Sequence, residues 1–442
     1  MKKIISLSLM VLCASAYSAT ISEIEGGYSI SVQNEETYEI SASTTPSWNK
    51  STNWNFSVDN YKSSDSATIN INLSSGTTFE GNVTVGSGIT ITTSGSGAKL
   101  ININGSSFTI EENATLKCNS TANTGSTIKG NSVVTVNGLY DLNTTNRYST
   151  PTTPELVFGD TRGSFKVIDS SLIIGKTGRI SQTLNKKNSG YYYEVNIKNS
   201  TLTTQSAVGT ADFSHILLFQ GNSTWNMQST NAVISGNRLD TVTSQANSVF
   251  YLATDSVSPA NLTLNVSQKD LNGNYTHNEL GTIYYYDYSQ LYIDVSALNG
   301  ATFTDAQGQQ STNSLNINYL KPIDVQELIS EGLMTQEGSE LFEEVENAKI
   351  ELFVNLGDLE VGEKTLRIGN LKELLKSGLV DVYTYSNADL SDLELLEYVE
   401  STEMLGSYLI DENGWITAVP EPAEWALIFG GLALAFVWYR RK

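Results

Sequence analysis

Short stretches in which β-branched residues alternate with Asn, Ser or Thr recur along most of this chain, and they limit what it can fold into. A period of two is typical of strands that have one buried face and one exposed face. Turn sequences rich in Gly, Asn and Ser separate the stretches. Examples are ATININL (67–73), GITITT (88–93), SVVTVNG (132–138), ANLTLNV (260–266) and SLNINYL (314–320). The sequence therefore predicts a mainly β fold.

A weak repeat runs through the strand-like segments between residues 83 and 110. Pairs of apolar residues return after 18 or 19 positions. A repeat of about twenty residues with two short strands is typical of a coiled solenoid of parallel strands. We expect residues 20–319 to form a right-handed parallel β-helix, and a β-sandwich is the alternative. The repeated pairs are Val83 and Val85 with Ile101 and Ile103, and Ile89 and Ile91 with Phe108 and Ile110.

The region from residue 320 to residue 418 has a different character. Between residues 321 and 412 there are 22 Asp and Glu against 6 Lys and Arg, a net charge of −16. Two segments, 324–333 and 371–379, have helix-like spacing with a closing Gly, and 348–356 and 379–385 resemble strands. We expect a small acidic α/β cap over the last apolar layer of the solenoid. The alternative is a few final turns of the solenoid with helical inserts.

The charge of the whole chain limits its partners. Over 442 residues it has 47 Asp and Glu against 26 Lys and Arg, a net charge of −21. Proteins that bind nucleic acid need clustered Lys and Arg to contact phosphates. We therefore exclude nucleic acid as a partner, and the same argument disfavours an anionic membrane surface.

The first 19 residues have the pattern of a signal peptide. Lys2 and Lys3 precede an apolar stretch at 4–13, and ASA at 14–16 is a small-residue cleavage site. This leader predicts export of the chain. Its removal leaves Cys118 as the single cysteine, so we expect no internal disulfide.

The last 24 residues, 419–442, combine three features in order. A Pro-Glu-Pro motif comes first, an apolar run without charge follows at 425–439, and three basic residues end the chain. Fifteen apolar residues are fewer than the ~20 of a usual span, but the basic end fits a cytoplasmic terminus. We expect a transmembrane helix with the bulk of the chain outside. The residues concerned are Pro420, Glu421 and Pro422, then Trp425, Phe429, Gly430, Gly431, Phe436, Trp438 and Tyr439, and finally Arg440, Arg441 and Lys442.

This tail resembles the PEP-CTERM sorting signal of Gram-negative bacteria. The resemblance implies that an exosortase, a membrane enzyme, recognises and processes the tail. It also implies export and an association with exopolysaccharide, since members often accompany exopolysaccharide production. The ectodomain resembles, by its strand pattern, the passenger and adhesin β-helices of exported bacterial proteins, including autotransporters.

Residues suited to catalysis are few and dispersed. The two histidines, His215 and His277, are 62 positions apart, and the Asp residues of 20–319 stand singly, with no adjacent Asp pair and no Asp-Xaa-Asp in a strand. A metal site needs ligands close together, and glycoside hydrolysis needs paired carboxylates. We expect no enzyme activity, no cofactor and no metal. A β-helix polysaccharide lyase or hydrolase is the enzymatic alternative.

Two tyrosine clusters, at 191–195 and 283–295, give a further hint. Successive residues of a strand point to opposite faces, so about half of these rings face outward. Exposed rings can stack on sugars, and stacking between neighbouring strands is the other explanation.

Together these features predict an exported structural protein of the cell surface or extracellular matrix. Its expected partners are an exosortase, extracellular polysaccharide, and the membrane through its C-terminal helix before processing. A glycan-binding adhesin is the alternative function, and the polysaccharide enzyme is the second alternative.

Overall fold

The structure is a computed structural model in which nearly all regular structure is β. Among the described residues, one short helix has defined bounds, α2 (Leu371–Lys376). The prediction of a mainly β fold is therefore confirmed. The described residues are 19–40, 44, 46–47, 49–72, 77–94, 101–118, 125–141, 155–158, 163–175, 179–182, 193–205, 215–228, 233–234, 249–252, 260–269, 275–304, 308, 310–324, 326, 330, 347–419 and 439.

One side of the molecule is a sheet of 14 strands, here called sheet A. Its strands are parallel from β2 to β33, and an antiparallel strand closes each end. In order across the sheet they are β1 (Ala19–Ile24), β2 (Gly27–Val32), β4 (Asn53–Val58), β7 (Val83–Val85), β10 (Ser107–Ile110), β13 (Val133–Val136), β17 (Ser171–Ile174), β20 (Thr201–Thr204), β22 (Asn222–Met227), β25 (Asn261–Val266), β27 (Ser289–Asp294), β31 (Ile350–Asn355), β33 (Val380–Thr384) and β34 (Glu394–Leu395).

Two further long sheets lie beside sheet A. Sheet B has seven strands: β3 (Thr37–Ile40), β5 (Ala67–Asn72), β8 (Ile89–Ser94), β11 (Thr115–Cys118), β14 (Leu139–Asp141), β15 (Glu155–Phe158) and β18 (Arg179–Gln182). Sheet C begins with β6 (Thr77–Phe79), β9 (Ile101–Asn104), β12 (Gly125–Lys129), β16 (Gly163–Ile168), β19 (Tyr193–Lys198), β21 (His215–Gln220), β24 (Val249–Leu252), β26 (His277–Tyr285), β30 (Ser314–Pro322) and β32 (Leu366–Ile368). It ends with the antiparallel strands β38 (Trp415–Ala418), β37 (Tyr408–Ile410), β36 (Met404–Leu405) and β35 (Tyr398–Val399). The short β23 (Val233–Ile234) pairs with β26, and β28 (Thr302–Thr304) forms a separate hairpin with β29 (Gln310–Thr312).

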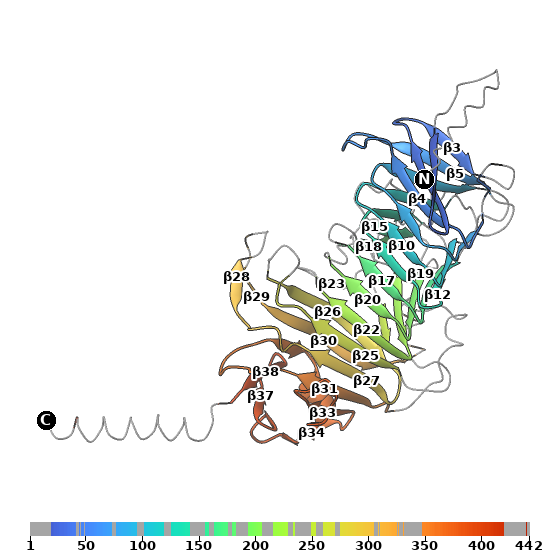
Figure 1. Ribbon diagram of the computed structural model, residues 1–442. Helices are drawn as coiled ribbons and strands as arrows, with labels where there is room; N and C mark the ends of the chain where they lie inside the picture. Colours follow the sequence, from blue (N-terminus) through green and yellow to red (C-terminus); the bar gives the residue numbers. More distant parts are fainter. Residues whose placement is uncertain are drawn as a thin grey trace, which may run out of the picture.

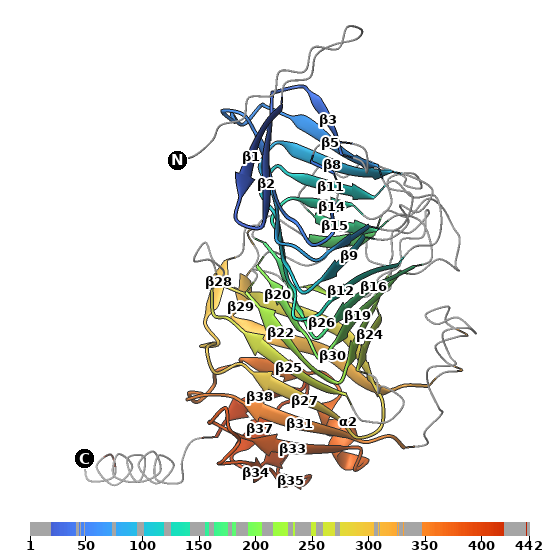
Figure 2. The same ribbon diagram turned by 45° about the vertical axis from the view of Figure 1, so that its right-hand side comes forward.

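Successive strands of the chain belong to different sheets. From β7 to β12 the chain enters sheets A, B and C in turn, twice. Figures 1 and 2 show the result as an elongated stack that runs from the N-terminal strands to the C-terminal ones. Each circuit of the chain therefore lies on the one before it.

The length of the repeat differs from the prediction. Val83 pairs with Phe108, 25 positions later, and Ile91 pairs with Leu116 at the same spacing. The predicted repeat of 18 or 19 residues with two strands is wrong, because each circuit also adds a strand to sheet C. Ile103 belongs to that third strand and pairs with Phe79.

One continuous apolar core fills the space between the sheets. Inward positions of sheet A stack in register from strand to strand, whereas the positions between them are mostly Thr, Asn or Ser. The alternation seen in the sequence therefore separates core from surface, as predicted. One such row of buried side chains consists of Phe56, Val85, Ile110, Val136 and Ile174.

A buried serine stands at the corner before successive strands of sheet A. The backbone N–H of each of the first four serines donates to the hydroxyl oxygen of the serine in the next circuit, over 3.1 to 3.4 Å. A residue with positive φ precedes each serine by one or two positions, which favours Gly, Asn or Asp there. The serines are Ser106, Ser132, Ser170, Ser200 and Ser223.

Replacing one of these serines should weaken the stack. In Ser170→Ala the buried N–H of Ser132 loses its acceptor, so we expect the free energy of unfolding to fall by about 1–3 kcal/mol. Urea denaturation followed by circular dichroism measures this. Ser171→Ala, at the neighbouring position that is not buried, is the control and should change the value by less than about 0.5 kcal/mol. Equal losses in the two variants would contradict the proposed ladder.

The acidic region continues the sheets before it closes them. The boundary expected at residue 320 falls inside β30, and β31 and β33 extend sheet A in parallel register. The helix expected at 371–379 is α2, followed by Gly378 with a φ of 66°. Up to residue 384, this region therefore continues the circuits of the stack and carries one helical insert. This is the alternative stated above, and not a separate α/β cap. The antiparallel strands β34 to β38 then cover the end. Most of the other expected helix, 324–333, lies outside the described residues.

Candidate functional site

The described residues include very little of the predicted sorting signal. Residues 1–18 of the predicted leader, the motif Pro420, Glu421 and Pro422, and almost all of the segment that follows lie outside them, whereas the last leader residue, Ala19, begins β1. Tyr439 is described, and its side chain is 78% exposed. Within the part of the chain that the structure describes, no helix is both long and apolar enough to cross a bilayer.

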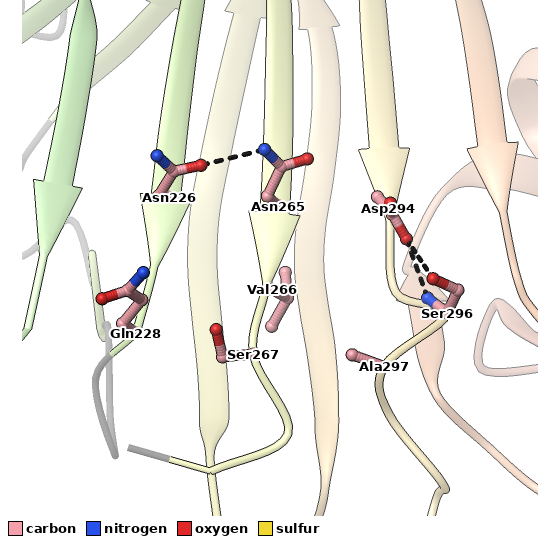
Figure 3. A pocket seen from close by; sticks show the side chains of 8 residues that line it. All are labelled: Asn226, Gln228, Asn265, Val266, Ser267, Asp294, Ser296 and Ala297. Carbon is pink, nitrogen blue, oxygen red and sulfur yellow. Dashed lines mark hydrogen bonds between the residues drawn. The ribbon is translucent and has the colours of Figure 1, made fainter. Parts of the chain in front are cut away.

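A polar groove lies on the outer face of sheet A, where β22, β25 and β27 end (Figure 3). Its volume is about 210 Å³. Six of the eight residues that line it carry an amide, hydroxyl or carboxylate group, so it can form hydrogen bonds with a ligand. The lining residues are Asn226, Gln228, Asn265, Val266, Ser267, Asp294, Ser296 and Ala297.

Strand register places three groove residues side by side. Asn226 pairs with Asn265, and Asn265 pairs with Asp294, so one side chain from each of three adjacent strands points out of the same row. Each lies between inward residues that belong to the core, which fixes its outward direction. Their separations in sequence are 39 and 29 positions, because the connections between these strands differ in length.

Hydrogen bonds within the row hold the side chains in place. Asn265 Nδ2 donates to Asn226 Oδ1 over 2.9 Å, and Asn226 Nδ2 donates to Thr203 Oγ1 over 3.4 Å. Asp294 Oδ1 accepts from the Ser296 N–H at 3.0 Å and from its hydroxyl at 2.6 Å. Among the described residues, no hydrogen bond uses Asn265 Oδ1, Asp294 Oδ2 or the Gln228 side-chain amide, which leaves these groups available to a ligand.

A row of stacked aromatic rings lies beside the groove. Tyr292 stacks on Phe353 with ring centres 4.4 Å apart, and Phe353 stacks on Tyr383 at 4.9 Å. Burial, together with the Glu351 carboxylate, raises the pKa of Tyr292, so its phenol stays protonated and donates to Gln290 Oε1 at 3.0 Å. Tyr292 comes from the second predicted tyrosine cluster, and its packing is the stacking between strands that the sequence offered as an explanation.

Other members of that cluster have different environments. Tyr285 is fully buried, whereas Tyr288 is 60% exposed at a turn with positive φ. The first cluster, 191–195, is only partly included in the described residues. The clusters alone therefore did not identify which ring lies beside a groove.

The one charged group among the residues that line the groove is the Asp294 carboxylate. The strands β22, β25, β27, β31 and β33 contain no Lys or Arg, and their other acids, Glu351 and Asp381, lie towards the opposite end of the strands, since Glu351 pairs with Gln290. Glu351 and Asp381 are register partners on adjacent strands. Glu351 accepts a hydrogen bond from Gln290 Nε2 at 2.6 Å. An anionic ligand would meet only repulsion from charged groups of these strands.

The histidines and the lone cysteine do not form a common site in the described structure. His277 Nδ1 lies 3.2 Å from the Thr312 carbonyl oxygen and 3.3 Å from Ser314 Oγ, contacts between neighbouring strands. His215 begins β21 and Cys118 ends β11, in different sheets. Within the described ranges, no group of three or more His, Cys, Asp or Glu side chains is arranged to hold a metal ion.

The structure is that of a mainly β protein with long, largely parallel sheets and a groove lined by polar side chains on the outer face of one of them. Comparisons with protein-family models, with curated proteins and with solved structures gave no match.

Proposed function

We propose that this chain is an exported, non-enzymatic structural protein of the cell surface or extracellular matrix, associated with exopolysaccharide, and that its ectodomain is a right-handed parallel β-helix. The observation that supports this most is the parallel register of sheet A over successive circuits, with one apolar core inside and Thr and Asn outside. Parallel crossover connections are right-handed in nearly all proteins. Such a stack makes a rigid, elongated body that suits a structural role.

The chemistry of the groove supports binding rather than catalysis. Glycoside hydrolysis uses two carboxylates, one on each side of the scissile bond. Among the eight residues that line the groove, Asp294 is the one carboxylate. It accepts two hydrogen bonds from Ser296, and these hold the carboxylate in a fixed position.

The ends of the sequence support export and sorting. The leader at 1–19 directs the chain out of the cytoplasm, and the tail at 419–442 resembles a PEP-CTERM signal. In this proposal the tail anchors the chain in the membrane until an exosortase processes it. The acidic region between residues 320 and 418 then lies next to the membrane.

Processing of both ends is the experiment that tests this proposal. Intact-mass spectrometry of protein extracted from the cell surface should give a mass without the leader and without residues 425–442. A main species that retains Arg440–Lys442 would overturn sorting and leave a plain membrane anchor.

A matched variant tests the motif itself. Replacing Pro420 and Pro422 with Ala should leave membrane insertion intact, because the apolar run is unchanged, but should stop processing, so that the unprocessed mass accumulates. The same change at Pro151 and Pro154, far from the tail in sequence, is the control and should not alter processing.

A glycan-binding adhesin is the second candidate function. The specific observation in its favour is the polar groove beside the stacked ring of Tyr292. Binding to a glycan array without cleavage of the glycan would support the adhesin. Release of reducing ends from the polysaccharide would instead point to a polysaccharide lyase or hydrolase.

A further inference from the structure

We infer that the groove on sheet A binds an uncharged polysaccharide, laid across the ends of β22, β25 and β27, with Tyr292 at its side. This inference rests on the proposed association with extracellular polysaccharide, and it adds the face of the molecule and the chemical class of the polymer. It is carried by the groups that the groove presents, by their charge and by their spacing.

The groups without a protein partner complement hydroxyl groups. Asn265 Oδ1 and Asp294 Oδ2 are acceptors, and the Gln228 amide offers both donors and an acceptor. A sugar hydroxyl can donate to an acceptor and accept from a donor at once. A ligand with many hydroxyls therefore satisfies this set, whereas an apolar ligand would leave these polar groups unpaired.

The charge of the surface selects against acidic polymers. Asp294 is the one charged side chain among the residues that line the groove. No Lys or Arg is among these lining residues to pair with a uronate or a phosphate. An uncharged chain avoids this repulsion, so the observations favour it over an anionic one.

The spacing of the row suits a chain rather than a single sugar. Three partly exposed residues, Asn226, Asn265 and Asp294, lie in register on three adjacent strands, and the next residues of the row on either side, Thr203 and Asn355, are buried. Neighbouring strands are about 4.8 Å apart, so the accessible row spans roughly 10 Å. A polymer that crosses the strands can therefore meet polar groups at regular intervals.

Tyr292 adds an apolar contact at the edge of this row. One face of its ring is covered by Phe353, and its register partner on the other side is the small Thr263. The side chain is partly exposed and lies two positions before Asp294 on the same face of β27. An aromatic ring next to fixed hydrogen-bonding groups is the usual composition of a site that orients a ligand.

Binding of the full-length chain in mild detergent tests the inference. Biolayer interferometry with dextran, laminarin and xylan as neutral probes, and with alginate and polygalacturonate as acidic probes, compares the two classes. We expect binding to at least one neutral probe and none to the acidic probes. Asn265→Ala and Asp294→Asn should each weaken neutral binding about tenfold, the effect of losing one good hydrogen bond to the ligand.

The control is Thr135→Ala, on the same outer face of sheet A but in β13, which should bind as the unaltered chain does. Circular dichroism of every variant checks that the fold is kept. Three results would overturn the inference: no binding to any neutral probe, neutral binding that both groove variants leave unchanged, or binding to an acidic probe that Asp294→Asn strengthens. Neutral binding that chelator abolishes would assign the groove to a cation instead. Failure of surface sorting would overturn the proposed function without altering these affinities.

Discussion

Trp225→Ala should destabilise the protein more than any single change on its surface. The indole is fully buried in the middle of sheet A, and its ring stacks on Phe219 with centres 6.0 Å apart. Its Nε1 also donates to Thr204 Oγ1 at 3.1 Å. Removing a buried aromatic side chain leaves a cavity, so we expect the free energy of unfolding to fall by about 3–5 kcal/mol.

Two further variants separate the causes of this loss. Trp225→Phe keeps a stacked ring but removes the donor to Thr204, and it should cost about 1–2 kcal/mol. Thr224→Ala, outward on the same strand, should change stability by less than about 0.5 kcal/mol. Thermal and urea unfolding measure all three. If Trp225→Ala is no worse than Thr224→Ala, the indole does not belong to a packed core.

Much of the fold could be predicted because alternation is a local property. In Asn261–Val266 the residues at even positions are apolar, and this short stretch determines both the strand and its buried face. Other local patterns located α2, from helix-like spacing with a closing Gly, and the strands β31 and β33. Each of these predictions depended on a few neighbouring residues and needed no knowledge of the rest of the chain.

The length of a circuit could not be predicted in the same way. Phe108 lies beside Val83, but the sequence between them also includes Ile101 and Ile103, which have the same apolar character. Pairs of similar residues do not reveal which strands are neighbours, because parallel pairing depends on the path of the whole circuit. The corner serines would have been a better guide. Ser106 and Ser132 each follow a Gly or Asn with positive φ and precede an alternating strand, 26 positions apart.

The groove was beyond prediction for a related reason. Asn226, Asn265 and Asp294 come from three circuits of unequal length, so no fixed spacing in the sequence joins them. Asn is also frequent on every outer face, and nothing local distinguishes a groove residue from any other surface Asn. Asp294 stands at the end of a predicted strand, and its place beside Asn265 follows only from register.

Gly414→Ala should detach the strands that close the C-terminal end of the stack. Gly414 has a φ of 82°, and a Cβ at this position would lie 2.0 Å from the Ile368 carbonyl oxygen. A backbone oxygen cannot move aside as a flexible side chain can. The left-handed conformation costs about 1–2 kcal/mol for a residue with a Cβ, and overpacking typically adds about 1–3 kcal/mol.

The contacts around this turn show what the change would loosen. Ile368 donates its N–H to the Gly414 carbonyl at 3.0 Å, which ties the turn to β32. Asp411 accepts from the N–H groups of Asn413 and Trp415 and pairs with Lys364 Nζ at 2.8 Å. Burial acts to raise the pKa of Asp411, but these hydrogen bonds outweigh it and hold the pKa below its usual range. The turn is thus fixed in one conformation, and it cannot easily relax around a new methyl group.

Gly378→Ala is the matched control, because Gly378 also has a positive φ, 66°, but a Cβ there would meet no atom within 4 Å. It should cost about 1–2 kcal/mol from backbone strain alone. Hydrogen exchange should then show faster amide exchange over 404–418 in Gly414→Ala than in Gly378→Ala, since Leu405, Ile410 and Ile416 are buried only while the closing strands stay in place. Equal exchange in both variants would mean that the clash is absorbed locally. A terminal cap keeps the last apolar layer of a solenoid from water, so the loosened closing strands of Gly414→Ala should expose part of the apolar core at this end of the stack.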